Sequence, residues 1–597
     1  MKTFPLVRAK WSNEHVMAAL FVVLILYLSP LWIDSPKNIL SFLAVLLFSL
    51  VLDAVINIVR YKKPTCAVSA AVSAAVLQIL APEVPLLGQL FGAAAALLIG
   101  KHIWGGTGRN PINPAITGLL LMSLLFDIGI ASFKPSYILI PAILLSLPFV
   151  RFRPFAAISF MAGMATALLF NQELSISAII SYGIFFWGCV VITDPVTTTM
   201  RPLLGAISGL AAGFLPVYFF GTTTALAAGI LGVNIVSYAL DKFDKTSNDS
   251  LYIPFNINKY ISFSENKGHI QDLVREEDPC QDNVVSDSKD TILKRIEANE
   301  VFGFGGAAFP VYKKIRTVMD SDAPEKHLII NGVECDPGLI HDKWLLRQYP
   351  EEICKGIELV CKCESFASVT LAVKDAKGLL MPEDLKIHRV PGYYPVGAEG
   401  LLIKTVLDKT IPHNEIPAKS GILVLNVQTL FYIYEAVCKN KKADSRFLTL
   451  ADIRNMSRQI VKVRLGTKIR DVAASVYPGS GHAFCGGGLM QSKSVCDEDI
   501  VDKSVNFIAV GNFPNYKESV LCSKCGFCVE RCPAGLKVNE IAHLVDAGRF
   551  KEAKSLHAEK CMGCGSCSFV CLAGKNLSAR MKTAKEYIHL NPVTKGQ

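Results

Sequence analysis

The sequence predicts a multidomain chain: a polytopic α-helical membrane bundle of about ten spans, fused to an α/β domain, a small α+β domain and an α-helical domain with two metal clusters. Three observations lead to this fold class. Residues 1–240 are a succession of long apolar stretches, a glycine-rich turn near residue 305 precedes a buried-strand pattern, and eight cysteines near residues 522–571 fall in two runs of the same spacing. At 597 residues, the chain exceeds what one hydrophobic core usually holds.

Apolar stretches of roughly bilayer-crossing length fill the first 240 residues. Ten spans are expected, at about Val16–Ile33, Ile39–Val59, Cys66–Leu80, Val84–Ile103, Pro114–Ser132, Tyr137–Val150, Phe155–Phe170, Ile176–Ile192, Leu203–Phe219 and Thr223–Leu240. The basic loops all fall on one face of such a bundle, so the positive-inside rule places both termini and the soluble half in the cytoplasm. The lipid bilayer is therefore an expected partner.

The formal net charge of +10 does not indicate nucleic acid as a partner. No basic stripe with interleaved aromatic residues stands out, and loop charges that obey the positive-inside rule account for the excess.

Two segments of the membrane half place glycine, proline and polar residues between apolar runs. Lys101–Ala115 reads KHIWGGTGRNPINPA, and Thr193–Pro202 reads TDPVTTTMRP. Such sequences are typical of broken helices whose free backbone groups line a cavity or ligand site, although each alone also fits an ordinary turn. Asp53 lies within a predicted span, where a carboxylate is a functional candidate.

The strongest chemical signal is the pair of cysteine runs. CSKCGFCVERCP (Cys522–Pro533) matches the C-x2-C-x2-C-x3-C-P pattern of [4Fe–4S] proteins, and CMGCGSCSFVC (Cys561–Cys571) repeats the cysteine spacing with Leu572 in place of proline. In two-cluster proteins the fourth cysteine of each run ligates the other cluster. The predicted ligand sets are therefore Cys522, Cys525, Cys528 and Cys571 for one cluster, and Cys561, Cys564, Cys567 and Cys532 for the other. Two zinc sites are the alternative, but zinc sites do not require this register twice.

A second chemical signal lies upstream. VFGFGGAAFP (Val301–Pro310) leads into a helical pattern, and a glycine-rich turn at a helix N-terminus offers N–H groups to phosphate. Many glycine turns bind nothing, so the turn alone is weak. The strand pattern His327–Ile330 then runs into NGVECDPGLIHDK (Asn331–Lys343), a loop that presents two acids and an amide.

The membrane half resembles a known family. A GGxGxNxxNPA segment followed about eighty residues later by TDPVT is similar to the membrane D subunit of the Rnf electron transport complex and to the B subunit of the sodium-pumping NADH:quinone reductase. Members of that family often carry a Ser-Gly-Ala-Thr segment whose threonine bears FMN. The nearest string here, Gly221–Thr224, lacks the pattern, so covalent FMN is not expected, and a non-covalent flavin or a quinone in the membrane half stays open.

The soluble half resembles the C subunit of the Rnf complex and, more distantly, the NADH- and FMN-binding subunit of respiratory complex I. The family motifs GxGGAGFP, NxxExEP, YPxGxE and NVxT occur in order across residues 295–430. The resemblance implies a non-covalent FMN held by Gly303, Gly305, Gly306, Asn331 and Gly397. It also implies that Glu334, Asp336 and Glu399 act near the flavin or nicotinamide. Three substitutions depart from the pattern: Ala308 for glycine, Val311 for threonine and Asp336 for glutamate.

The expected domains follow from these boundaries. They are a transmembrane bundle (1–242), a linker or reduced N-terminal segment (243–294), an FMN- and NAD(H)-binding α/β domain (295–430), a small α+β domain (431–515) and a two-cluster ferredoxin domain (516–597).

The leading hypothesis is a membrane-bound oxidoreductase of the prokaryotic inner membrane. NAD(P)H would give a hydride to FMN, and single electrons would pass through two [4Fe–4S] clusters to an acceptor at or in the membrane half. In the reverse direction the donor would be ferredoxin or another redox protein. The resemblance implies other Rnf-like membrane subunits as partners, and it suggests ion translocation. The alternatives are a non-pumping electron-relay module without nucleotide activity, and a transporter with an attached redox sensor.

Overall fold

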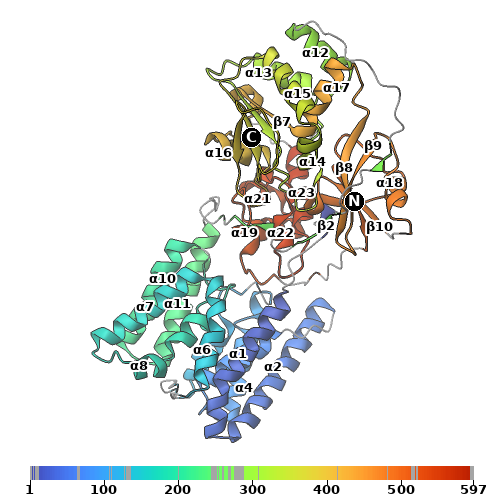
Figure 1. Cartoon of the computed structure of the whole chain (residues 1–597). Coiled ribbons are helices and arrows are strands. Elements are labelled where there is room, and N and C mark those ends of the chain that lie inside the picture. Colours follow the sequence, from blue (N-terminus) through green and yellow to red (C-terminus); the bar gives the residue numbers. More distant parts are fainter. Residues whose placement is uncertain are drawn as a thin grey trace.

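The computed structural model describes residues 3–4, 6, 12–62, 68–106, 108, 110–126, 128, 133, 136–199, 201–243, 252, 254–257, 261–265, 271–273, 288–306, 308–412, 415–479, 482–512, 518 and 522–591. A helical body is built from the residues up to 243, and a mixed α/β body is built mainly from the later ones (Figure 1). Most of the expected linker 243–294 lies outside the described residues.

The helical body places a helix or a group of helices at each of the ten predicted spans. Its helices are α1 (Asn13–Asp34), α2 (Lys37–Tyr61), α3 (Val68–Leu80), α4 (Leu86–Leu98), α5 (Pro114–Ser123), α6 (Leu139–Ser146), α7 (Pro154–Phe170), α8 (Ile176–Ser181), α9 (Ile184–Phe186), α10 (Pro202–Phe219) and α11 (Thr223–Phe243). Five helical stretches among the described residues, Glu14–Asp34, Lys37–Arg60, Leu86–Trp104, Pro202–Phe219 and Thr223–Leu240, are long and apolar enough to cross a membrane. The predicted span at Ile176–Ile192 is broken at Gly183 and continues through a π-helical stretch, Trp187–Val191.

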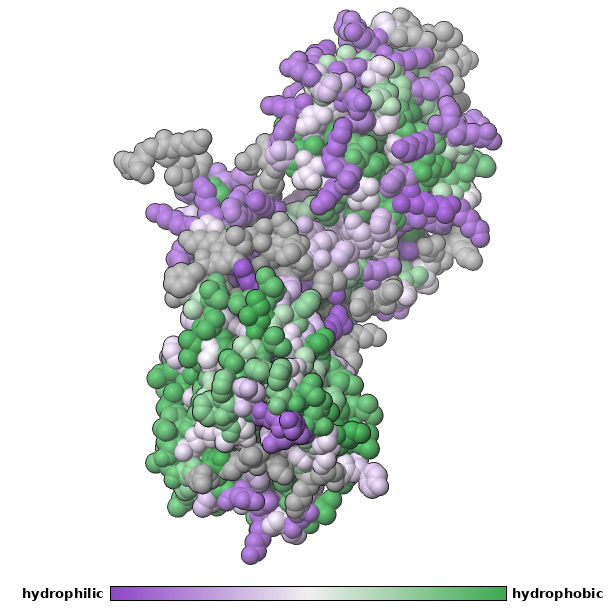
Figure 2. All heavy atoms as spheres, turned by 90° about the vertical axis from the view of Figure 1, so that its left-hand side faces the viewer, coloured by the Kyte–Doolittle hydropathy of each residue, from purple (hydrophilic) through white to green (hydrophobic). Residues whose placement is uncertain are grey.

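The outer surface of this body is apolar. Leu40, Val59 and Leu87 leave 73%, 79% and 80% of their surface exposed, which in water would be unfavourable and in lipid is not. Figure 2 shows the same feature on the face that it displays: hydrophobic residues predominate over the lower body, and hydrophilic residues are more frequent over the upper body. The chain is therefore a multi-pass membrane protein.

The first soluble unit is a four-stranded parallel sheet in the order β6-β5-β4-β7 with helices packed around it. Its elements are α12 (Lys289–Ala298), α13 (Val311–Met319), β4 (His327–Asn331), α14 (His341–Gln348), α15 (Pro350–Cys363), β5 (Ser368–Val373), β6 (Lys386–Arg389), α16 (Glu399–Leu407), β7 (Ile422–Asn426) and α17 (Val427–Cys438). Strands β4 and β7 read HLIIN and ILVLN, near-continuous apolar runs whose first four residues are buried in each strand, as in strands covered on both faces. The expected boundary at residue 430 falls inside α17.

A second sheet joins distant parts of the chain in the order β1-β11-β10-β12-β8-β9-β2, with β3 beside β9. Its elements are β1 (Thr3–Phe4), β2 (Ser264–Glu265), β3 (Gln271–Asp272), β8 (Ser445–Asp452), β9 (Ser457–Arg464), α18 (Ile469–Val476), β10 (His482–Gly486), β11 (Ser492–Ser494) and β12 (Phe507–Gly511). The edge strand β1 precedes the first membrane helix, and it pairs antiparallel with β11. The small α+β unit is thus completed by segments from before residue 431.

The regular elements in the described residues of the cysteine-rich unit are all helices, as predicted, and loops that carry most of the cysteines connect them. It consists of α19 (Phe527–Glu530), α20 (Val538–Asp546), α21 (Phe550–Ser555), α22 (Ser566–Phe569) and α23 (Leu577–Leu590). The multidomain fold class, a membrane bundle fused to α/β, α+β and helical cysteine-rich units, is confirmed.

Candidate functional site

The first candidate site lies at the carboxyl edge of the parallel sheet, where ligands of open α/β sheets usually bind. β4 ends at Asn331 and β7 ends at Asn426, and the register pairs these two residues directly. Asn331 donates through Nδ2 to the carbonyl of Gly397 (3.0 Å) and accepts at Oδ1 from the N–H of Val333 (3.1 Å). The two amides therefore lie side by side at the strand ends and hold the Gly397 loop against them.

The glycine-rich turn borders this edge. Gly303 donates its N–H to the carbonyl of Phe309 (2.9 Å), and the N–H of Phe304 donates to Thr429 Oγ1 (3.0 Å) at the start of α17. Gly306 has a φ of 102°, a conformation that favours glycine. A methyl group on Gly305 would lie 3.7 Å from Cβ of Asn426, so the turn passes close over the strand end.

The substitution Ala308 sits in the same turn. Its φ is 50°, so the alanine adopts the left-handed conformation that the glycine of the family pattern would adopt with less strain.

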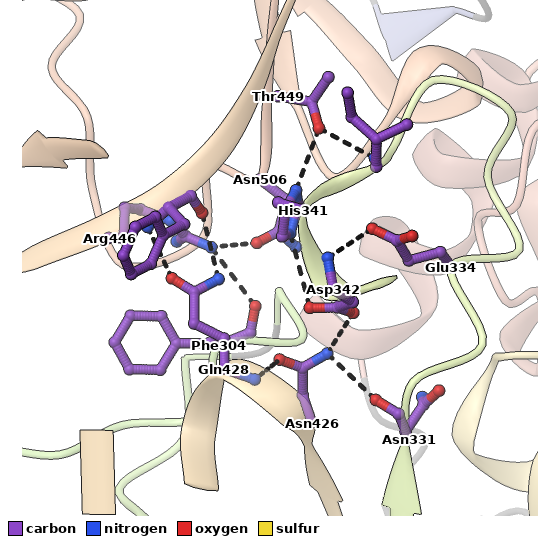
Figure 3. A network of polar contacts seen from close by, with 12 residues as sticks. Phe304, Asn331, Glu334, His341, Asp342, Asn426, Gln428, Arg446, Thr449 and Asn506 are labelled. Carbon is purple, nitrogen blue, oxygen red and sulfur yellow. Dashed lines mark hydrogen bonds and ion pairs between the residues drawn. The ribbon is translucent and has the colours of Figure 1, made fainter. Parts of the chain in front are cut away.

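A buried group of Glu334, His341 and Asp342 lies beside the two amides (Figure 3). Their ligand atoms all lie within 4.8 Å of one another. Glu334 accepts the N–H of Asp342 at 2.6 Å, and Asp342 accepts from Asn426 Nδ2 at 2.6 Å. Asp342 Oδ1 is buried without a hydrogen-bond partner among the described residues.

Burial controls the protonation of this group. It raises the pKa of Glu334, and burial together with the Glu334 charge raises the pKa of Asp342 well above its ordinary value. Burial lowers the pKa of His341 to about 3. Both carboxyls thus favour the protonated form more than exposed acids do, and they lie beside an imidazole that burial keeps neutral, which is a suitable arrangement for proton exchange with a bound group.

Arg446 supplies the nearby positive charge. Its side chain is fully buried, stacks over the Phe304 ring (5.5 Å to the centroid), and donates to Asn506 and to the carbonyl of Lys503 (2.8 Å). Burial lowers its pKa to about 10, so it stays charged at neutral pH. Its Nη2 also donates to the carbonyl of Phe304 (3.4 Å), so β8 holds the glycine turn in place.

Asp336 has a different environment from the one the sequence predicted. Its Oδ1 accepts the N–H groups of Gly338 (2.8 Å) and Leu489 (2.9 Å), and its Oδ2 accepts that of Met490 (3.0 Å). Both oxygens are thus engaged by backbone donors, and the side chain ties the loop after β4 to the second sheet.

Glu399 begins α16 at the rim of the site and is 42% exposed. Lys314 of α13 donates to it (2.8 Å) and also to the carbonyl of Val424 (2.8 Å). The predicted residues Gly303, Gly305, Gly306, Asn331, Glu334 and Gly397 therefore gather around one edge, whereas Asp336 faces the second sheet and Glu399 the exterior.

Sequence reasoning missed four members of this site. Asp342 and Asn426 lay within recognised motifs without an assigned role; Asn426 ends strand β7, and Asp342 lies in the first turn of helix α14. His341 and Arg446 carried no local signal, because a single histidine or arginine has no characteristic spacing.

The eight predicted cluster cysteines form two groups. The electrostatic interactions of their sulfurs link Cys525 and Cys528 mainly with Cys522 and Cys571, and link Cys532 and Cys567 mainly with Cys561 and Cys564, while weaker interactions of Cys567 with Cys528 and Cys571 connect the two groups. The four cysteines of the second group line one common hollow. No disulfide joins the cysteines of the described residues.

This donor set fits [4Fe–4S] clusters. Backbone N–H groups donate to the sulfur of the first and of the last cysteine in each run. The donors are Lys524 to Cys522, Leu536 to Cys532, Gly563 to Cys561 and Lys575 to Cys571, all at 3.4 Å. Such N–H donors stabilise the thiolate charge of a cluster and tune its potential. Without metal, burial raises the pKa of Cys525 and Cys532 to about 12, so free thiolates would be unfavourable there.

The cysteine-rich unit contacts the first candidate site through its second run. Tyr394 donates its hydroxyl to the carbonyl of Cys564 (2.7 Å), and Gly565 packs against the carbonyl of Met490. Met490 is also held by Asp336, so the cysteine loop and the loop after β4 meet at one seam.

The two interrupted membrane segments also meet. Asn113 donates to Asp194 Oδ2 (3.2 Å), and Asn234 of α11 links both segments, accepting from the N–H of Asn113 (3.0 Å) and donating to the carbonyl of Thr197 (3.2 Å). Asp53 is buried in a separate group, where it binds Lys101 Nζ (2.7 Å) and His102 Nε2 (2.8 Å).

Comparison with known proteins gives three matching segments. Residues 1–137 match the NQR2, RnfD, RnfE family, residues 296–435 match the Nuo51 FMN-binding domain, and residues 515–583 match a 4Fe-4S dicluster domain.

Curated relatives match about half of the chain. The C subunit of the ion-translocating oxidoreductase complex of Buchnera aphidicola subsp. Acyrthosiphon pisum is 27% identical over 302 residues, which are 47% of this chain and 62% of the relative. The corresponding C subunit of Haemophilus influenzae (strain ATCC 51907 / DSM 11121 / KW20 / Rd) is 30% identical over 281 residues, 45% of this chain and 34% of the relative. The chain thus spans about a third to three fifths of the length of these relatives.

Among solved structures, an NAD+-reducing [NiFe]-hydrogenase in the H2-reduced state aligns with 51% of this chain and 62% of its own at 19% identity. Its TM-score of 0.36 is too low to support an argument. The family matches instead confirm the predicted resemblance: this chain joins a segment of the NQR2, RnfD, RnfE type to an FMN-binding domain and a 4Fe-4S dicluster domain similar to those of the C subunit, as in a fusion of D-type and C-type subunits.

Proposed function

We propose that this chain is a membrane-bound oxidoreductase that passes electrons between NAD(P)H and an acceptor in or at the membrane, through FMN and two [4Fe–4S] clusters. The observation that carries the proposal is the seam at Tyr394 and Cys564, where the flavin-type site and a four-cysteine group belong to one packed unit. Electron transfer requires the flavin-type site and the cysteine group to lie close together, whereas two binding domains with unrelated functions would not need this contact.

The FMN site is formed by Gly303, Gly305, Gly306, Asn331 and Gly397. The turn offers backbone N–H groups to phosphate, and the paired amides at Asn331 and Asn426 face the strand-end edge. When bound, FMN accepts a hydride as a two-electron unit and returns single electrons. Glu334 and Asp342 hold a proton beside it, and Glu399 with Lys314 offers polar contacts for the nucleotide at the rim.

Asp336 acts in this proposal as a positioning residue. Its three backbone donors engage both carboxylate oxygens, and they fix the loop that carries Glu334.

The cluster ligands are Cys522, Cys525, Cys528 and Cys571 for one cluster and Cys561, Cys564, Cys567 and Cys532 for the other. Held as thiolates, these side chains bind iron, and the clusters supply one-electron transfer.

The membrane half provides the second redox partner and the ion path. The pairing of Thr3–Phe4 with the soluble sheet supports a location of the segment before α1 on the same side as the soluble half, which the positive-inside rule places in the cytoplasm. A flavin or quinone is the acceptor proposed for the membrane half, and Asp53 with Lys101 and His102 is the candidate ion-coupling group. Other Rnf-like subunits, and ferredoxin as the donor in the reverse direction, complete the proposed assembly.

The test is an anaerobic titration of the purified full-length chain, with NADH or NADPH compared with dithionite. Absorbance reports the flavin and EPR reports the clusters. We expect nucleotide to bleach the flavin and to raise cluster signals. If only dithionite reduces the clusters, the chain is an electron-relay module without nucleotide activity.

A matched pair of variants isolates the glycine turn. Gly306→Ala strains a residue at φ 102° within the site and should lower the flavin content. Gly466→Ala imposes a similar strain at φ 86°, where a new Cβ meets nothing within 4 Å, and should leave flavin content unchanged. Equal flavin loss in both variants would mean that backbone strain in general, and not this turn, controls binding.

A further inference from the structure

The first cysteine run faces the membrane half. Arg153, at the start of α7, is 4% exposed, and it donates through Nε to the carbonyl of Thr198 (2.7 Å) and through Nη2 to the carbonyl of Lys524 (3.1 Å). The same nitrogen also donates to the carbonyl of Pro195. One buried guanidinium therefore joins the loop between Cys522 and Cys525 to the TDPVT segment.

Aromatic and charged contacts extend this interface between the cysteine-rich unit and the membrane half, called the membrane interface below. Phe527 in α19 stacks on Phe152 with ring centroids 5.7 Å apart and an interplanar angle of 21°. The Arg151 guanidinium also lies over the Phe527 ring, 5.5 Å from its centroid. Glu530, also in α19, interacts with both Arg151 and Arg153, so an acid on the cysteine-rich unit faces two cations of the membrane half.

The membrane half and the cysteine-rich unit approach each other very closely at Gly108. A methyl group there would fall 1.5 Å from the carbonyl oxygen of Cys522, and the φ of Gly108 is 82°. Only glycine allows the first cysteine of the run to lie against the GGxGxN segment.

The membrane interface covers the place where the two interrupted segments meet. Asn113 binds Asp194 below it, and Asp194 interacts electrostatically with Arg153 and Lys524 above it. Figure 1 shows α19 at the lower edge of the soluble body, toward the membrane helices. The second cysteine run makes its contacts elsewhere, with Tyr394 and Met490 of the flavin-type site.

We propose that the two cysteine groups have fixed positions along the electron path: the Cys561 group adjoins the flavin site, and the Cys522 group is the port to the membrane half, docked through Arg153, Phe527 and Gly108. The inference rests on the proposed function and specifies its route. Each hydride taken from NAD(P)H supplies two electrons, which leave one at a time through the Cys522 group to a flavin or quinone in the membrane half. The proton balance is completed by exchange with solvent.

Removing one cluster at a time tests the order. In Cys525→Ala, iron content should fall to that of one cluster, and NADH should still reduce the remaining cluster within the mixing time of the experiment. In Cys564→Ala, NADH should reduce the remaining cluster at least about tenfold more slowly, because the relay nearest the flavin is gone, while dithionite reduces it normally. The reverse pattern would overturn the assignment.

A cross-linking experiment tests the membrane interface itself and does not depend on enzyme activity. p-Benzoylphenylalanine introduced at Phe527 of the full-length chain should, on irradiation, cross-link to peptides containing residues 105–113, 148–155 or 194–199. The same group at Phe550, which stacks on Tyr587 within the cysteine-rich unit, is the matched control and should give no cross-link to residues 1–240. Equal cross-linking from both positions, or none from Phe527, would refute the docking.

The outcomes separate this inference from the proposed function. If NADH reduces neither flavin nor clusters in the unmodified chain, the nucleotide activity fails, and the cross-link at Phe527 still tests the membrane interface. If NADH reduces both clusters but the two cysteine variants behave alike, the activity stands and the fixed order fails.

Discussion

Replacing Asp336 with asparagine separates a positioning role from a chemical one. The carboxylate accepts three backbone N–H groups, two at Oδ1 and one at Oδ2. In Asp336→Asn the amide oxygen can keep the bonds from Gly338 and Leu489. The new NH2 group then faces the N–H of Met490, so two donors meet without an acceptor.

The expected loss follows from these bonds. A hydrogen bond to a charged group contributes about 1.5–3 kcal/mol, and a buried donor left unsatisfied costs about 1–3 kcal/mol. Burial raises the pKa of Asp336, which shows that part of this gain already offsets the cost of burying its charge. We therefore expect a net loss of about 2 kcal/mol in the free energy of local opening where the loop after β4 contacts Leu489 and Met490, or about 30-fold faster amide exchange.

Hydrogen exchange measured by mass spectrometry on the full-length chain reports this loss in peptides around residues 334–340 and 486–492. Gly488→Ala is a second perturbation of the same contact, because its Cβ would lie 2.3 Å from Cγ of Asp336, and it should accelerate exchange in the same peptides. Asp375→Asn, at an exposed carboxylate, is the control and should change exchange less than twofold. Unchanged exchange in Asp336→Asn together with loss of NADH-driven reduction would refute the positioning role.

Three further predictions concern the same domain. Arg446→Met should destabilise the full chain in urea pulse proteolysis by about 3 kcal/mol, because it leaves buried acceptors without a donor, and a neutral result would contradict its bridging role. His341 has a folded-state pKa of about 3, so this residue favours proton binding by the unfolded state below about pH 6.5, whereas the raised pKa values of Glu334 and Asp342 act in the opposite direction. Between pH 7.5 and 4.5, stability should therefore fall by about 2–3 kcal/mol more in the unmodified chain than in His341→Gln in the same assay. Ala308→Gly should cause no loss of stability, since φ is 50° there, whereas Ala579→Gly in helix α23 should cost about 1 kcal/mol, and equal losses would argue against strain at Ala308.

The sequence predicted what depends on local spacing. Each cysteine run carries its own register, so the two groups of four sulfurs could be assigned from the residue spacing alone. The strand pattern at His327–Ile330 likewise located Asn331 and Glu334 at a strand end, because an apolar run must stop where polar residues begin. Helix-length apolar stretches gave the membrane half in the same way.

Other parts of the site depend on contacts between distant segments. Asn426 lies beside Asn331 only because β7 pairs with β4 in one particular register. Arg446 reaches the glycine turn from about 140 residues away in sequence. Arg153 and Lys524 are 371 residues apart, and neither has a local pattern that marks the other as its partner. Such pairings follow from the packing of whole elements, which a single sequence does not specify.

The pairing of β1 with β11 has a consequence for biosynthesis. Thr3 and Phe4 leave the ribosome before helix α1, whereas their partners Lys493 and Ser492 follow nearly 490 residues later. The short strand must therefore wait, unpaired, through the insertion of the whole bundle and the folding of the first soluble domain. Its docking is therefore a late event in folding, and a premature partner for that sheet edge would trap the newly made protein.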